Sequence, residues 1–176
     1  MAGPLGRALK SVGGPGKRLA KKGVRASYWA SNRRLIRQLK RKPSKIIISL
    51  NGNGITGTSD LVNLIATSVD PETPVIWSGA PPPIRRRKSW KKALTSDEGF
   101  LKTYNIRKGF NETVRGIVEA QGWTFIDPYD YIKFDQPKIV GNNAFESGYV
   151  CSNCDGIHLP KSVAVQYANK ISGIIS

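Results

Sequence analysis

The sequence predicts an α/β protein in which a parallel sheet carries helices on both faces. Short apolar runs at residues 45–50, 74–78 and 123–126 have the length and the β-branched or aromatic content of strands. The first run holds three consecutive isoleucines, which is typical of a parallel strand buried on both faces. Segments with helical spacing of apolar residues separate these runs, and such alternation favours a parallel sheet with right-handed crossovers.

The residues before the first strand are expected to form short helices. Gly23 would cap the second of them, Val24–Trp29 is interpreted as a short extended segment, and Ser31 or Asn32 would cap the third helix before Pro43 stops it. The helices expected here are Pro4–Val12, Lys17–Lys22 and a third one that reaches about Arg41.

The later elements alternate with loops. The turn at 51–54 leads to a helix from about Thr58 to Thr67, and residues 84–96 are interpreted as a basic, irregular loop. A long helix over about 97–121 carries an apolar stripe, and the last helix presents apolar residues on one face. Residues 128–154 are expected to be rich in loops. The length suits a single domain over 1–176, with a basic loop insertion at 80–96.

The charge of the chain is lopsided. Lysine and arginine number 28 against 12 acids, which gives a net charge of +16, and fourteen of these cations precede residue 46, whereas the first acid is Asp60. A second cluster, Arg85, Arg86, Arg87 and Lys88, follows the triple proline and is a candidate for binding polyanions. Nucleic acid, an anionic polymer, an acidic lipid surface or an acidic protein would all fit, and so would a basic face that contacts only water.

The chain contains no apolar run of membrane-spanning length, and its N-terminal residues lack the apolar core of a signal peptide. We therefore expect a cytoplasmic location or a place in a larger assembly such as a virus particle. The compartment itself stays open.

A single histidine, His158, draws attention as a proton-transfer group. Asp155 precedes it by three residues across a glycine-containing turn and could reach the imidazole to fix its tautomer. The alternative is structural, with Asp155 capping the last helix and His158 in its first turn.

Cys151 and Cys154 form a C-x-x-C motif just before Asp155. Together with His158 they could supply three zinc ligands, but the sequence contains no further cysteine or histidine for a fourth. A disulfide or two free thiols is the favoured interpretation, and no metal or cofactor is expected.

Taken in order, several segments resemble the SGNH (GDSL-type) hydrolase superfamily across nearly the whole chain. Leu50–Gly54 resembles its third block, G-x-N-D, with Gly54 in place of the aspartate. Val75–Pro83 is similar to a strand and proline loop of many members, and Trp123–Tyr129 to the last strand and its exit. Asp155–Leu159 matches the fifth block, D-G-x-H-x. The resemblance implies a three-layer, flavodoxin-like sheet.

The resemblance also implies roles for individual residues. His158 would be the general base that activates a serine, and Asp155 would orient it. The Asn53 side-chain amide would donate a hydrogen bond to the oxyanion of the tetrahedral intermediate, a contribution of about 3 kcal/mol, and Gly52 would belong to the same oxyanion site. The alternative for Asn53 is a turn residue that accepts a positive φ.

The chain departs from the family where the nucleophile should stand. The first block, a buried strand that ends in Gly-Asp-Ser, is absent, and Met1–Gly6 resembles the segment that follows it. Ser27 and Ser31 are alternative nucleophiles, although neither follows a strand. Another polypeptide could contribute the missing strand, the sequence could omit part of the functional protein, or the fold could be retained without catalysis.

Three functions are therefore weighed. The leading one is a serine ester hydrolase that removes acyl groups, such as O-acetyl groups on a carbohydrate or cell-wall polymer. The second is a catalytically inactive component of a larger assembly that docks through its basic surface. The third is a nucleic-acid-binding module, in which Tyr28, Trp29 and Trp90 would stack on bases.

Overall fold

The computed structural model describes residues 4–12, 17–21, 23–50, 52–83, 97–132 and 161–175. Its three strands form one parallel sheet in the order β1-β2-β3. Ile47 is the partner of Ile76, and Ile76 is the partner of Thr124. The elements are α1 (Pro4–Val12), α2 (Ala26–Ala30), α3 (Arg33–Leu39), β1 (Ile46–Ser49), α4 (Thr58–Ala66), β2 (Val75–Ser78), α5 (Asp97–Glu119), β3 (Thr124–Ile126), α6 (Pro128–Tyr131) and α7 (Lys161–Ile175).

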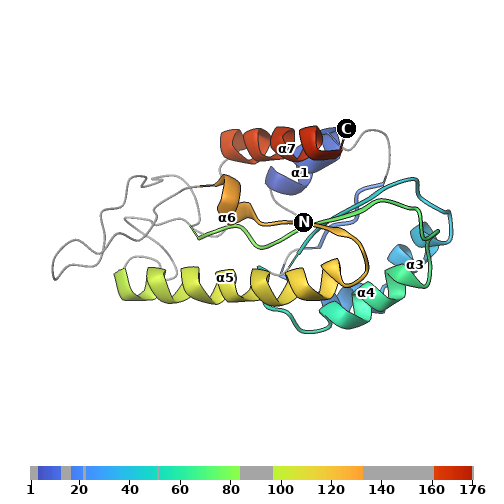
Figure 1. The fold of residues 1–176 in the computed structure, drawn as a ribbon, viewed down its shortest axis with the longest axis horizontal. Coiled ribbons are helices and arrows are strands. Elements are labelled where there is room, and N and C mark those ends of the chain that lie inside the picture. Colours follow the sequence, from blue (N-terminus) through green and yellow to red (C-terminus); the bar gives the residue numbers. More distant parts are fainter. Residues whose placement is uncertain are drawn as a thin grey trace.

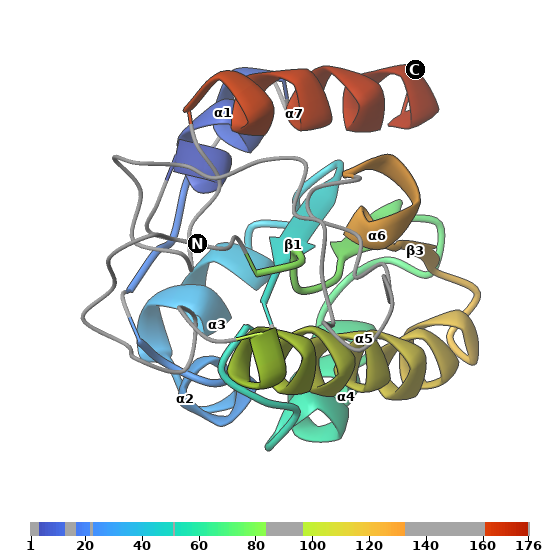
Figure 2. The ribbon, with the colours of Figure 1, turned by 90° about the vertical axis from the view of Figure 1, so that its left-hand side faces the viewer.

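Helices cover both faces of the sheet, so the predicted α/β class is confirmed. Figures 1 and 2 show α1 beside α7 on one face, with α4 and α5 on the other. Side chains alternate along each strand, so Ile76 packs with the α1–α7 layer while Trp77 packs with the α4–α5 layer. Each layer therefore has its own apolar core.

The two cores combine strand residues with the apolar faces of the helices. The core under α1 and α7 contains Ala8, Leu9, Ile76, Ile126, Ile132, Ala164, Tyr167, Ala168 and Ile171. The core on the other face contains Ala26, Trp29, Leu39, Ile48, Leu61, Val62, Ile65, Val75, Trp77, Val114 and Val118.

Local signals placed most elements correctly. The three strands and the first helix lie where they were expected, within one or two residues. Asn32 is the N-cap of α3, and its Oδ1 accepts hydrogen bonds from the N–H groups of Arg34 at 3.0 Å and Leu35 at 3.1 Å. α5 runs without a break through Gly109 and ends before Gly122, whose φ of +73° suits glycine.

Two predictions near the N-terminus are wrong. Residues 17–21 are not helical, because Leu19 is the one side chain there that packs on the core, and a single apolar residue does not make a helical face. The segment expected to be extended over Val24–Trp29 instead forms α2 from Ala26 onward. Ala26 and Trp29 lie three residues apart, so one helical turn buries both of them together.

One short helix was missed in the stretch that was expected to be loop. Asp127 caps α6 by accepting a hydrogen bond from the Tyr129 N–H at 3.0 Å, and Pro128 occupies the first turn. An Asp-Pro pair after a strand therefore starts a helix here. Across the parts of the chain that the structure describes, no helix is both long enough and apolar enough to span a bilayer.

Candidate functional site

Polar loops follow the carboxyl end of each strand. The Gly52–Asn53 turn follows β1, the buried loop Gly79–Pro83 follows β2, and Asp127 follows β3. Because the strands are parallel, these three ends lie at the same edge of the sheet. In open α/β sheets this is the edge where ligands bind.

Asn53 lies on an exposed turn next to the N-terminal end of α2. The Arg25 Nε donates a hydrogen bond to the Asn53 carbonyl oxygen at 3.2 Å, and the Ser27 N–H donates to the Thr56 carbonyl oxygen at 3.2 Å. Both bonds tie the start of α2 to the loop after β1. Arg25 thus fixes the main chain of Asn53 while the side chain of Asn53 stays exposed.

The backbone angles of this turn show whether Asn53 is needed for a positive φ or for its side chain. Among the described residues, Lys42 is the one non-glycine residue with a positive φ, so Asn53 is not needed for a left-handed conformation. Gly54 does take that conformation, with a φ of +111°. Glycine at 54 therefore has a backbone reason, whereas the asparagine at 53 does not.

Gly57 allows α2 to lie directly against the loop. Its φ is +77°, and a Cβ at this position would collide with the backbone of Ser27. The N-terminal end of α2 therefore approaches the loop as closely as a backbone can. Ser27 and Ser31, the alternative nucleophiles, are exposed on and just after α2.

The loops after β2 and β3 are held by a buried amide. Asn111 of α5 is fully buried, and its Oδ1 accepts a hydrogen bond from the Ala80 N–H at 2.7 Å. Its Nδ2 donates to the Ala80 carbonyl oxygen at 3.0 Å and to the Asp127 Oδ1 at 2.8 Å. One side chain thus joins the ends of both strands to α5.

Two arginines extend this network, which we call the Asn111 network. The Arg107 Nη1, which is buried, donates to the Pro81 carbonyl oxygen at 3.0 Å. The Arg115 Nη2 lies 3.5 Å from the Asp127 Oδ2. The charge-assisted bond from Arg107 satisfies a buried main-chain carbonyl, and Arg115 pairs with the Asp127 carboxylate. The Gly79–Pro83 loop is therefore a rigid wall of the candidate site.

A hydroxyl pair joins α7 to the end of β2. The Ser78 Oγ and the Tyr167 Oη lie 2.9 Å apart, and Tyr167 is only 2% exposed. Burial raises the pKa of Tyr167 well above its ordinary value, the hydrogen bond with Ser78 lowers it by less, and the charge of Asp127 adds to the increase. α7 is thus anchored to the sheet close to the same edge.

The structure describes part of the predicted site. It places Gly52 and Asn53 together with Arg25 and Ser27, whereas Asp155 and His158 lie outside the described residues. So do the basic cluster at 85–88 and the two cysteines at 151 and 154. Within the described ranges, no group of three or more His, Cys, Asp or Glu side chains lies close enough to hold a metal ion.

The sequence-based reasoning missed the residues of the Asn111 network. A signal for them was present, because Arg107 and Asn111 occupy the same helical stripe as Val114 and Val118, at spacings of four, three and four residues. A polar residue on an apolar stripe needs a buried partner. The sequence alone does not say which loop supplies it.

The comparisons with known proteins give a likeness in structure but not in sequence family. No family model matches the sequence, and no curated protein matches it. The structure is similar to Est24, a carbohydrate acetylesterase from Sinorhizobium meliloti, with a TM-score of 0.52 and 16% identity over 97% of this chain and 83% of that one. An identity this low shows the fold alone. The chain has a flavodoxin-like α/β fold, with a parallel sheet between two layers of helices.

Proposed function

We propose that this chain is the larger part of an SGNH-type serine ester hydrolase that removes acyl groups, with O-acetyl groups on carbohydrate as the first substrate class to test. The observation that carries the proposal is the placement of Asn53. Its side chain is exposed at the carboxyl end of β1, and its backbone conformation does not call for asparagine. The likeness of the fold to a carbohydrate acetylesterase supports the same direction.

In the proposed reaction, a serine hydroxyl attacks the ester carbonyl carbon and passes its proton to the imidazole of His158, which Asp155 orients. The side-chain amide of Asn53 donates a hydrogen bond to the oxyanion, and Gly52 helps to position the turn that carries Asn53. The protonated imidazole then protonates the departing alcohol oxygen. Water, activated by the same histidine, releases the acid from the acyl-serine.

The proposal places the serine on a segment outside these 176 residues, because no Gly-Asp-Ser strand is present in them. A companion polypeptide or a further segment of the same protein could carry it. The test therefore uses native material rather than the isolated chain. Intact-mass analysis combined with a fluorophosphonate probe identifies both the serine and the polypeptide that carries it.

Substitution of Asn53 tests its role in this native material. Asn53→Ala should lower kcat by about 10²–10³-fold with an unchanged melting temperature, because an oxyanion donor acts only in the transition state. Asn63→Ala, at an exposed position of α4, is the matched control and should retain activity. His158→Ala should abolish turnover of a short-chain chromogenic ester and of acetylated oligosaccharide. Unchanged turnover in both the Asn53 and the His158 variant would contradict the assignment.

A second candidate function is a non-catalytic component of a larger assembly, such as a virus particle, that docks through basic surface. The described residues from 17 to 45 carry eleven lysines and arginines, and all of them are exposed. Native material that takes up no fluorophosphonate, but binds an acidic partner in a salt-dependent manner, would favour this function over the hydrolase.

A further inference from the structure

β1 lies at an edge of the described sheet. It pairs with β2 on one side, and the strand order β1-β2-β3 places no described strand on its other side. An edge strand presents main-chain donors and acceptors that can pair with another extended chain. Such an edge is a docking surface if it is accessible and if the surroundings select a partner.

The register of β1 shows which residue faces outward. The Ile46 N–H donates to the Pro74 carbonyl oxygen at 2.9 Å, so the main-chain groups of Ile46 point toward β2. In a parallel strand the direction alternates with each residue. The N–H and C=O of Ile47 therefore point toward the outer edge.

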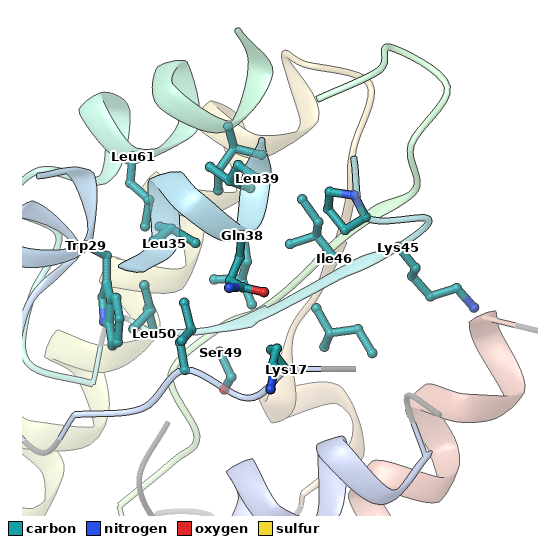
Figure 3. A pocket seen from close by; sticks show the side chains of 15 residues that line it. Lys17, Trp29, Leu35, Gln38, Leu39, Lys45, Ile46, Ser49, Leu50 and Leu61 are labelled. Atoms are coloured by element: carbon teal, nitrogen blue, oxygen red, sulfur yellow. The ribbon is translucent and has the colours of Figure 1, made fainter. Parts of the chain in front are cut away.

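A cavity of about 200 Å³ runs along this edge, lined by every residue from Ile46 to Leu50. Figure 3 shows α3 on one side of the strand with Gln38 reaching toward it, Trp29 at one end, and Lys17 on the other side of the strand; Leu35 and Leu39 of α3 also line the cavity. The walls are mostly apolar. This groove, which we call the β1 groove, has room for apolar side chains of an extended chain whose backbone follows β1.

The surroundings of the β1 groove are strongly cationic. Lys17 and Lys45 line it, and the described residues from 17 to 50 carry exposed lysines and arginines but no acid. α4, which adds Leu61 and Ile65 to the walls, carries one acid, Asp60, in its first turn. An approaching chain rich in acids would be attracted, and one rich in lysine or arginine would be repelled. The partner is thus selected by charge as well as by shape.

We propose that the outer edge of β1 binds an extended, acidic segment of a companion polypeptide, which joins the sheet as an additional strand. Hydrogen bonds to the main chain of Ile47 align the segment, alternate apolar side chains enter the β1 groove, and acidic residues face Lys17 and Lys45. The inference is independent of ester hydrolysis, because it depends only on the edge, the groove and their charge.

The test is a display library of random twelve-residue peptides, selected for binding to the folded chain. Surviving peptides should be enriched in Asp and Glu, depleted in Pro, and should slow amide hydrogen exchange in residues 46–50. Ile47→Pro removes the outward N–H and should weaken binding of the best peptide by at least about tenfold. Ile47→Ala loses similar packing but keeps the N–H, so it should bind within about threefold of the wild-type.

A charge-exchange experiment covers the case in which the proline variant does not fold. The double variant Lys17→Glu with Lys45→Glu should lose the acidic peptide and gain a peptide in which each Asp and Glu is replaced by Lys. The same change at Lys102 and Lys108, exposed on α5, should have little effect.

Three outcomes would overturn the proposal. Selected peptides without acidic enrichment, or peptides that protect no amide of β1, would show that the edge is not their site. Protection of β1 by self-association of the purified chain would make a second copy the occupant. Protection by a single-stranded oligonucleotide, and not by acidic peptide, would make the surface a nucleic-acid site instead.

Discussion

The two halves of the candidate site are built in different ways. The loops after β2 and β3 are buried and joined to α5 by the side chain of Asn111, which makes three hydrogen bonds of 2.7–3.0 Å. The turn after β1 is exposed, and the link from Arg25 to the Asn53 carbonyl oxygen is 3.2 Å long. One half is a buried, hydrogen-bonded wall, and the other is an exposed turn beside a strand edge that no described strand covers.

The two halves differ in where their main-chain groups find hydrogen-bond partners. Buried main-chain groups must find partners within the fold, and Asn111 and Arg107 supply them for the Gly79–Pro83 loop. An exposed turn can exchange its hydrogen bonds with water, substrate or another chain at little cost. The side of the site next to β1 is therefore the side where a ligand or a companion segment would bind.

Removal of the Asn111 amide should have the largest effect on stability. Asn111→Ala leaves the buried N–H and C=O of Ala80 without their partner and removes one donor from Asp127, which should lower the free energy of unfolding by about 3–5 kcal/mol. Asn105→Ala, exposed on the same helix, is the matched control, with an expected change within about 0.5 kcal/mol. Chemical denaturation measures both, and equal stabilities would show that the wall does not depend on this network.

Adding one methyl group to a glycine in each half of the site tests the difference between the buried loop and the exposed turn. A Cβ at Gly79 would lie 2.6 Å from the Asn111 Oδ1, whereas a Cβ at Gly52 would meet nothing within 4 Å. Gly79→Ala should therefore lower stability by about 1–3 kcal/mol, and Gly52→Ala should change it by less than about 0.5 kcal/mol. The measurement is the melting temperature of each variant, compared with that of the wild-type. A larger loss at Gly52 would reverse the comparison.

Alkaline pH should lower the stability of the fold through Tyr167, which joins α7 to the end of β2. Its pKa is raised in the folded state, so below pH 10 both states keep the proton, and above it the unfolded chain loses the proton first. The contribution of Tyr167 to stability should then fall by about 1.4 kcal/mol per pH unit. Tyr167→Phe lacks this loss, so its free energy of unfolding should approach that of the wild-type between pH 10 and 11.

The control for this experiment is Tyr131→Phe, because the Tyr131 side chain is 45% exposed. At neutral pH, Tyr167→Phe should cost about 1 kcal/mol for the hydrogen bond to Ser78. A constant difference between the Tyr167→Phe variant and the wild-type across the alkaline range would mean that the buried hydroxyl does not govern this transition.

Sequence reasoning was most successful where the signal is local. The consecutive isoleucines of β1 predicted a buried parallel strand because no other element hides apolar side chains on both sides so compactly. Asn32 predicted a helix start because its own side chain satisfies the first amides. It was wrong at α2, where burial of Ala26 and Trp29 together outweighed the extended preference of neighbouring residues.

The sequence by itself determined the α/β class, the strand positions and the residue types of the turn that carries Asn53, since periodicity and turn chemistry act over a few residues. Only the tertiary structure decided that Asn111 meets Ala80 and Asp127, that Arg25 holds the Asn53 turn and that the outer edge of β1 borders a groove. These features join residues from 16 to 31 positions apart in the chain. Such contacts depend on how whole elements pack, which no short pattern encodes.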